Sequence, residues 1–480
     1  MVNANLRRTH VAWVTVDTAI TAGLSFGAML ILARLVGPAE FAKAAIVLGV
    51  TQLVNLFVEG LFHDALIQRQ DVDAQHAGAA LVFTLLIAAT IFAGTATLLT
   101  VTPGLFGSGL DSLLKSSFFS LLFTGPLGVA SALARKKFDF SLVARASVAG
   151  KLFGCATGIT MAAMDAGALS LVWQYTSAVM LQSGLTVWPA SRQIVLNVKF
   201  RRLAPLLRFA LPFAFMHSLV ASRIQGFTIL VAALMGLTTA GYLNVAFRLT
   251  TTIQVILTTS FNNLAFPLLA RHQAVRSDLL RAYGHVSRMI VTATLPTLIG
   301  LSLVAEDFVM FTLGPGWERS VASIKIISVV GAISFLRLSG SLLLRALGYV
   351  RYSFWNAAFQ LIATIGGLLI VRPTSELEAV MFWVLPMLVQ LPLTFIIIKT
   401  TAMIDLREQW RHILPAVLAT ALMAVTLIAL SPFVSDFHLL LRLATEIFLG
   451  AATYVGSLLL LDRNLRRAFL VHLTQTLRLR

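Results

Sequence analysis

The chain has 480 residues, of which 58% are apolar and only 12% are charged, and its formal net charge is +17. The charged share is about half that of soluble globular domains, which excludes three ordinary soluble domains and indicates a membrane protein. At about 20 residues per helical crossing plus a short connection, this length holds on the order of 14 crossings and leaves no room for a large extramembrane catalytic domain.

Near-continuous apolar runs, bounded by Gly, Pro and charged residues, predict fourteen membrane-spanning helices. The runs lack the alternation of barrel strands, and helices pair their own backbone groups in lipid. The first run is longer than a typical signal-peptide core and lacks a convincing cleavage site, which favours a retained first helix. In chain order the predicted spans lie near 11–33, 42–66, 77–101, 112–134, 142–164, 167–188, 206–234, 240–266, 286–312, 321–346, 353–371, 377–399, 413–431 and 439–461.

A basic connection in the middle of the chain separates two sets of spans. We expect an N-terminal six-helix lobe at 1–188, a basic cytoplasmic linker at 189–205 and a C-terminal six-helix lobe at 206–400. Two additional transmembrane helices are expected at 401–461, followed by a basic cytoplasmic tail at 462–480.

The two sets of spans also resemble each other in one motif. The letters LVG ending at Gly37 precede Phe41, and the letters LMG ending at Gly236 precede Tyr242. Repeated halves are a common plan of transporters, so this match suggests a transport function.

The distribution of Lys and Arg tests the span count, since cytoplasmic loops are enriched in both. They gather in every second connection and at both ends, near 7–8, 69, 135–137, 192–202, 271–281, 351, 399–411 and 463–480. The opposite connections hold few of them and carry acidic residues such as Glu40, Asp165 and Glu376. We therefore expect a multi-pass membrane protein with both termini in the cytoplasm. Orientation explains the positive charge, so no nucleic-acid partner is expected.

Polar side chains recur at helical spacing on several predicted spans, and in lipid such a face must meet protein or water. Packing between helices through Ser and Thr is the competing explanation for such stripes. The stripe on the second span consists of Gln52, Asn55, Glu59 and His63, and the stripe on the eighth span includes Asn244 and Arg248.

Three arginines, Arg223, Arg248 and Arg337, lie about eight or more residues from either end of their predicted spans, too deep to reach headgroups. An aqueous cavity is therefore expected around them. Arg offers planar, bidentate donors suited to phosphate, so the expected ligand is an anion. The expected substrate-binding residues are Arg223, Arg248, Arg337, Asn244, Gln52, Asn55 and Lys151.

Two carboxylates in the first two spans, Asp17 and Glu59, lie at similar depth, and His63 lies one turn from Glu59. They either couple transport to H⁺ or Na⁺, or pair with Lys151, and the sequence leaves both possibilities open.

No motif for catalysis or metal binding is present. The chain has no Walker loop, no H-E-x-x-H and no Cys-rich metal spacing, so neither an enzyme nor a cofactor is expected. The single cysteine, Cys155, lies in an apolar run and is expected to be a small core residue.

Several segments together resemble the polysaccharide-transport (Wzx-type) flippases of the multidrug/oligosaccharidyl-lipid/polysaccharide (MOP) exporter superfamily. The hairpin ILARLVGPAEF at 31–41 is similar to the LARLLGPEEFG segment of that family, except that Ala42 and Lys43 follow Phe41 where the family usually has Gly. The resemblance runs from residue 10 to about residue 350. Its other segments are Ala65–Arg69, Leu133–Phe140, Gly241-Tyr242 with Ala246, Arg248 and Leu249, Phe266-Pro267, Leu313–Trp317 and Arg345–Gly348.

The resemblance implies an all-α polytopic membrane protein with two six-helix lobes around a central cavity, lined by the first, second, seventh and eighth helices. It implies a protein of the bacterial inner membrane that transports undecaprenyl-pyrophosphate-linked oligosaccharide to the periplasmic leaflet, for exopolysaccharide, capsule or O-antigen synthesis. The implied partners are membrane lipid, an H⁺ or Na⁺ gradient, and a polysaccharide polymerase with its export machinery. A cation-coupled multidrug exporter of the same superfamily is the alternative. A membrane polysaccharide polymerase or ligase is a third, although no outer connection is long enough for its catalytic loop.

Overall fold

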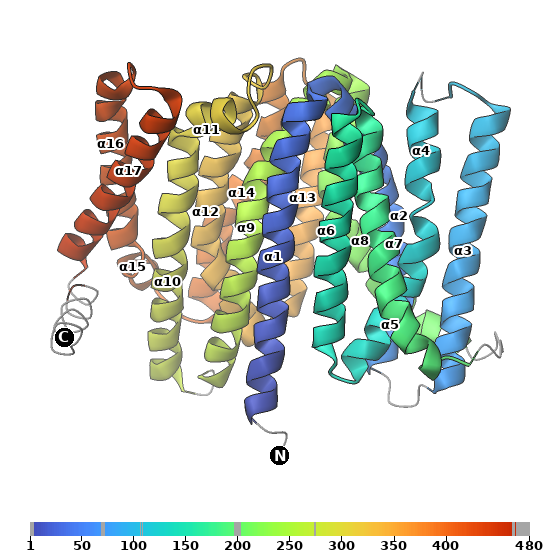
Figure 1. The fold of residues 1–480 in the computed structure, drawn as a ribbon. Coiled ribbons are helices and arrows are strands. Elements are labelled where there is room, and N and C mark those ends of the chain that lie inside the picture. The colour runs from blue at the N-terminus through green and yellow to red at the C-terminus, as the bar shows by residue number, and fades with distance from the viewer. Residues whose placement is uncertain are drawn as a thin grey trace, which may run out of the picture. The chain divides into compact units, whose positions relative to one another are not determined.

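The computed structural model describes residues 4–68, 73–105, 107, 109–195, 203–272, 275–462 and 466, and all regular elements in these ranges are helices (Figure 1). Helices suit lipid because each one satisfies its own backbone donors and acceptors. In chain order they are α1 (Ala4–Val36), α2 (Pro38–Gln68), α3 (Ala74–Val101), α4 (Leu110–Phe118), α5 (Leu121–Lys136), α6 (Phe140–Ala163), α7 (Ala168–Ala190), a 3-10 turn (Ser191–Gln193), α8 (Leu203–Met235), α9 (Leu237–Arg271), α10 (Arg276–Leu303), α11 (Ala305–Thr312), α12 (Ser320–Ala346), α13 (Val350–Val371), α14 (Glu376–Thr401), α15 (Leu406–Arg411), α16 (Leu414–Val434) and α17 (Leu439–Leu461).

Every one of the fourteen predicted spans falls on helix, and the prediction of an all-helical membrane protein is confirmed. Among the described residues, ten helices are long and apolar enough to cross a membrane. The predicted spans outside those ten lie on α1, α7, α8 and α9. Of these, α1 and α8 contribute shorter apolar segments, Ile20–Val36 and Ser222–Met235.

Two helix boundaries differ from the prediction. The span predicted at 112–134 is two helices, α4 and α5, which meet at Phe119 and Ser120. The span predicted at 286–312 begins ten residues earlier, at Arg276, and a separate short helix, α11, follows it. Charged residues hide the start of α10 from a hydropathy pattern, but they support the helix, because Arg281 donates to Asp278 at 2.6 Å with i, i+3 spacing.

The helices form two compact units. Unit 1 consists of Met1–Asn244 with Leu368–Pro373, and unit 2 consists of Val245–Gly367 with Thr374–Arg480. Helix α8 packs against α2 and belongs to unit 1, although it follows the linker predicted at 189–205. Residues 196–202 of that linker, and nearly all of the tail predicted at 462–480, lie outside the described residues. The predicted lobe boundaries therefore stay a prediction.

In unit 1, α6 and α7 approach each other closely along a row of glycines. Gly150, Gly154 and Gly158 recur every four residues on α6 and face α7. A Cβ atom at Gly154 would lie only 2.3 Å from the carbonyl oxygen of Gln174 and 2.6 Å from Cβ of Ala178. This is the small-xxx-small pattern by which membrane helices pack tightly, since glycine lets two backbones come together.

Two hairpins with matching sequences have matching backbone structure. Gly37 joins α1 to α2 with φ +77°, and Gly236 joins α8 to α9 with φ +90°. In each case the glycine N–H donates to a carbonyl oxygen four residues earlier, Ala33 at 3.2 Å and Ala232 at 3.0 Å. Only glycine adopts this left-handed conformation without a steric cost. The repeated sequence motif therefore encodes a repeated helical hairpin.

The departure from the family pattern after Phe41 is accommodated inside unit 1. Ala42 is fully buried, and a Cβ atom at Gly241 would lie 2.9 Å from Cβ of Ala42 and 2.7 Å from the carbonyl oxygen of Pro38. Gly241 therefore provides the space that the methyl group of Ala42 occupies. The second departing residue, Lys43, donates to Glu40 at 2.5 Å on the same helix.

Unit 2 has an apolar core formed by α9, α10, α12, α14, α16 and α17. Helices α16 and α17, which cover the additional spans predicted at 401–461, pack against each other and against α10. The hydroxyl of Tyr454 on α17 donates to the carbonyl oxygen of Thr292 on α10 at 2.7 Å. These two helices are thus packed into unit 2.

Candidate functional site

The predicted polar face of α2 lies partly inside unit 1, and Asn55 is its most buried member, at 2% exposure. Its amide nitrogen donates to the hydroxyls of Ser120, at 3.1 Å, and Tyr175, at 3.0 Å, and its carbonyl oxygen accepts from Thr124 at 2.9 Å. Asn55 thereby joins α2 to α5, α7 and the break between α4 and α5. This placement favours a role of Asn55 in holding α2 in position, because both ends of its amide already form hydrogen bonds within unit 1.

Gln52 lies one turn earlier on α2 and faces α8. The amide nitrogen of Gln225 donates to the side-chain oxygen of Gln52 at 2.9 Å, and Gly49 leaves space for the Gln225 side chain. Both glutamines are half-buried, and Arg223 on α8 is buried at 7% exposure. The facing sides of α2 and α8 therefore bring together two amides from segments far apart in the sequence.

Glu59 and His63 continue the α2 face toward the end of that helix, and both are half-buried. Glu59 lies close enough to Arg135 to interact electrostatically with its positive charge. It interacts in the same way with the hydroxyl group of Tyr175. Helix α5 approaches α2 closely here, because a Cβ atom at Gly128 would overlap the carbonyl oxygen of Glu59. Glu59 is thus connected through Tyr175 to the Asn55 network.

Asp17 lines a cavity of about 250 Å³ between α1 and α6. Its neighbours in the cavity include Arg145, Val148 and Leu152, and Ser147 and the charge of Arg135 also act on its carboxyl group. One carboxylate oxygen of Asp17, Oδ1, is buried without a hydrogen-bond partner. A buried carboxylate oxygen that lacks a donor favours binding of a proton or a cation.

The deep arginines predicted in the second half of the chain, Arg248 on α9 and Arg337 on α12, are half-buried in unit 2. Arg337 lies nine residues before the end of α12 at Ala346, which is about 14 Å along the helix axis. Arg248 lies eleven residues after the start of α9 at Leu237, about 17 Å along the axis. At such depths the charges need protein or water around them.

Two further predicted residues lie on α9 and α6. Asn244 is 6% exposed, and its carbonyl oxygen has no hydrogen-bond partner. Lys151 is half-buried on α6. On α12, Arg345 donates to the side-chain oxygen of Asn262 on α9 at 3.3 Å, which ties these two helices together near one end of α12.

Sequence reasoning did not find two polar groups that the structure brings together. The first is the set of hydroxyl partners of Asn55, which lie on three other segments. The second is a charged cluster formed by Glu306, Asp307, Lys325, Arg442 and Glu446, from α11, α12 and α17. The hydropathy pattern gave no signal for the second group, because these charges lie near helix ends, where ionisable residues are common.

A comparison with family models matches residues 31–322, more than half of the chain, to the family described as "Polysaccharide biosynthesis protein". The chain is similar to the succinoglycan biosynthesis transport protein ExoT of Rhizobium meliloti (strain 1021), with 24% identity over 482 residues, covering 98% of this chain and 96% of that protein. It is also similar to the lipopolysaccharide biosynthesis protein WzxC of Escherichia coli (strain K12), with 22% identity, covering 72% of this chain and 71% of that protein.

Among solved structures, the fold is similar to that of the lipid II flippase MurJ in an inward closed conformation. The TM-score is 0.78 at 12% sequence identity, covering 95% of this chain and 99% of that one. An inward-facing multidrug resistance MATE family transporter of the MOP superfamily gives a TM-score of 0.53 at 12% identity, covering 82% of this chain and 95% of that one. At these identities the likeness concerns the fold.

Proposed function

Because this chain belongs to the family of polysaccharide biosynthesis proteins, we propose that it is a flippase, not an enzyme, that carries undecaprenyl-pyrophosphate-linked oligosaccharide repeat units across the membrane. The predicted membership of the MOP superfamily is confirmed by the family match and the fold. The observation that carries the proposal is the presence of deep arginines in such a fold, in a chain similar over 98% of its length to a protein named for succinoglycan transport.

The arginines provide the part of the site that an anionic substrate requires. A charged side chain at the centre of a membrane helix costs at least about 2.5 to 3.5 kcal/mol. An apolar residue is therefore favoured at any such position that does not bind a ligand. Arg223, Arg248 and Arg337 bind the pyrophosphate or acidic sugars, because guanidinium groups match phosphate oxygens with two parallel hydrogen bonds.

The other predicted substrate-binding residues serve the sugar. Sugar hydroxyls cannot enter hydrocarbon without hydrogen-bond partners, and Gln52, Asn244 and Lys151 provide amide and ammonium groups. The unpartnered carbonyl oxygen of Asn244 is suited to accept from a hydroxyl. Asn55 acts indirectly, by fixing the α2 face on which Gln52 lies.

Transport is coupled to an H⁺ or Na⁺ gradient through Asp17, Glu59 and His63. The unpartnered oxygen of Asp17, in its cavity between α1 and α6, supports this assignment. The protein lies in the inner membrane, as the family resemblance implies, and the distribution of Lys and Arg supports cytoplasmic termini. The product passes to a polysaccharide polymerase and its export machinery, for exopolysaccharide, capsule or O-antigen synthesis.

A multidrug exporter is the second candidate, and the likeness to MATE transporters favours it at the level of the fold. A cationic drug, however, requires acidic or aromatic partners, whereas the charged substrate-binding residues proposed above are three arginines and a lysine. The sign of these charges therefore favours an anionic substrate.

The test is mass spectrometry of polyprenyl-linked sugars in cells depleted of the protein. We expect the lipid-linked repeat unit to accumulate and to be cleared when wild-type protein is restored. Arg223→Ala, Arg248→Ala and Arg337→Ala should each fail to clear it at normal protein level. Arg192→Ala, which removes an exposed arginine near the end of α7, is the matched control and should clear it. Normal surface polysaccharide in all three deep variants would overturn the assignment of the site.

A further inference from the structure

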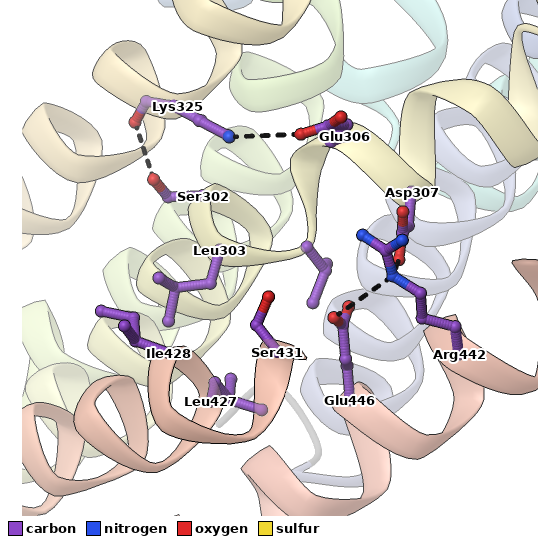
Figure 2. A pocket seen from close by; sticks show the side chains of 11 residues that line it. Ser302, Leu303, Glu306, Asp307, Lys325, Leu427, Ile428, Ser431, Arg442 and Glu446 are labelled. Atoms are coloured by element: carbon purple, nitrogen blue, oxygen red, sulfur yellow. Dashed lines mark hydrogen bonds and ion pairs between the residues drawn. The ribbon is translucent and has the colours of Figure 1, made fainter. Parts of the chain in front are cut away.

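A polar cavity of about 320 Å³ lies in unit 2, where the end of α10 and the short helix α11 meet α12, α16 and α17 (Figure 2). It takes its charges from three of these helices, and its lining also includes Ser302, Leu427 and Ile428. The cavity lies near the ends of α10 and α16 and the start of α17, the level at which lipid headgroups lie in a membrane.

The charges are arranged on two sides of the cavity. Figure 2 shows Lys325 and Glu306 toward one side, and Arg442 between Asp307 and Glu446 on the other. Nε of Arg442 is 2.6 Å from an oxygen of Asp307 but 3.8 Å from Glu446, and Nζ of Lys325 is 3.8 Å from Glu306. Separations of 3.8 Å are too long for hydrogen bonds. The two pairs at 3.8 Å are therefore loose, and their charged groups can turn toward a ligand in the cavity.

The hydrogen bonding of the closer pair is also incomplete. Asp307 Oδ2 and Arg442 Nε are buried and lack a well-aligned hydrogen-bond partner, although they are in contact. The side chain of Asp307 is only 6% exposed. The ion pair itself compensates most of the burial of both groups, and its poor alignment leaves some hydrogen-bonding capacity for a ligand with both donor and acceptor groups.

An apolar cavity of about 450 Å³ adjoins the polar one and shares Val304, Leu427 and Glu446 with it. It lies between α10 and the pair α16 and α17, and its lining also includes Phe308 and Ile447. A charged cavity that continues into an apolar one matches the shape of an amphiphile, with a polar head and a hydrocarbon chain.

We propose that these two cavities bind a zwitterionic phospholipid with a primary ammonium group, of the phosphatidylethanolamine class. The phosphate lies at Lys325 and Arg442, the ammonium at Glu306 and Glu446, and part of an acyl chain lies in the apolar cavity. The five charged residues comprise three carboxylates and two cations. This negative excess disfavours anionic lipids, including a polyprenyl pyrophosphate, and a choline headgroup has no N–H to donate to the carboxylates. The site is therefore separate from the substrate site, and its assignment does not depend on the proposed function.

Such a lipid would link the last two helices to the rest of unit 2. Its headgroup contacts α11 and α12 on one side and α17 on the other, so binding favours the arrangement in which these helices are packed together. A ligand that binds only the folded arrangement stabilises it by mass action. Depletion of this lipid class is therefore expected to lower the thermal stability of unit 2.

The test is native mass spectrometry of the purified, delipidated full chain. It is titrated separately with dioleoyl phosphatidylethanolamine, the corresponding phosphatidylcholine and phosphatidylglycerol, and undecaprenyl phosphate. We expect phosphatidylethanolamine to bind most tightly. The double variant Glu306→Gln with Glu446→Gln, and separately Lys325→Ala, should weaken its binding about tenfold or more, because each removes a charge-assisted contact. Arg372→Ala, which removes an exposed arginine elsewhere, is the control and should bind as wild type does.

A steric variant keeps the test decisive if the charge variants fold poorly. A Cβ atom at Gly300, which lines the apolar cavity, would meet only Cε of Met423, at 4.0 Å. The Cβ has space there, so Gly300→Leu should extend its side chain into the apolar cavity and improve helix propensity, yet lower phosphatidylethanolamine binding about tenfold. Equal binding of the three phospholipids, wild-type binding by Gly300→Leu, or tighter binding of undecaprenyl phosphate would each overturn the proposal.

Discussion

The close contact between α6 and α7 makes Gly154→Ala a sharp test of how unit 1 is held together. The added Cβ would lie 2.3 Å from the Gln174 carbonyl oxygen and 2.6 Å from Cβ of Ala178, and neither atom is the end of a flexible side chain. Relief requires the two helices to separate, and such overpacking costs about 1 to 3 kcal/mol. Alanine regains about 0.5 to 1 kcal/mol over glycine through helix propensity. The net expected loss centres on about 1 kcal/mol and reaches about 2.5 kcal/mol.

The single cysteine of the chain reports directly on this interface. Cys155 follows Gly154, is 8% exposed and accepts a weak hydrogen bond from Gln174 on α7 at 3.9 Å. On heating, a thiol-reactive fluorophore should label Cys155 when α6 and α7 separate. Since about 1 kcal/mol corresponds to about 2 to 4 °C for a unit of this size, Gly154→Ala should lower the midpoint of labelling by about 2 to 8 °C.

Gly184→Ala on α7 is the matched control, because nothing lies within 4 Å of the Cβ that it adds. This variant should label at or above the wild-type midpoint. The reasoning is refuted if Gly154→Ala labels at the wild-type temperature, or if the two substitutions lower the midpoint equally.

Three further predictions concern other parts of the chain. Asn55→Ala should lower the same labelling midpoint, since three buried hydrogen bonds are lost at a cost of about 2 to 4 kcal/mol; an unchanged midpoint would show that these bonds do not hold α2. Gly236→Ala should cost about 1 to 2 kcal/mol because φ is +90°, whereas Gly23→Ala, in open space, should not; equal midpoints would argue against the strained hairpin. Burial, followed by the charges of nearby arginines, lowers the pKa of His412 from its ordinary value of about 6.5. The unfolded chain therefore takes up a proton more readily below that pH, and wild-type thermal stability should fall between pH 7.5 and pH 5.5 more than that of His412→Gln. The same pH dependence in both proteins would contradict this assignment.

Much of the fold follows from short-range information in the sequence. An apolar run of about 20 residues must form a helix in lipid, since no other single segment satisfies its own backbone groups. A glycine between two such runs, as at Gly37 and Gly236, predicts a sharp reversal because only glycine tolerates the left-handed conformation. The start of α10 is hidden from a hydropathy pattern because Asp278 and Arg281 follow helical charge spacing instead.

The candidate site was harder to predict, because helical spacing shows which residues share a face but not what that face meets. Gln52 and Asn55 share a face on α2, yet they meet different helices of unit 1. Gln52 meets Gln225 of α8, whereas Asn55 meets Ser120 and Tyr175. Side chains that project at slightly different angles from one helix reach different neighbours. Contacts between segments far apart in the sequence, such as Arg442 with Asp307, leave no periodic signal at all.

The most direct test of the central claim is transbilayer movement of a lipid-linked oligosaccharide in proteoliposomes that contain the purified chain. Movement to the opposite leaflet should be accelerated by wild-type protein and by the Arg192→Ala control. It should be slowed about tenfold or more in Arg248→Ala and Arg337→Ala, because each loses a charge-assisted contact to the pyrophosphate. No acceleration by the wild-type protein, or full activity in both deep variants, would contradict the account.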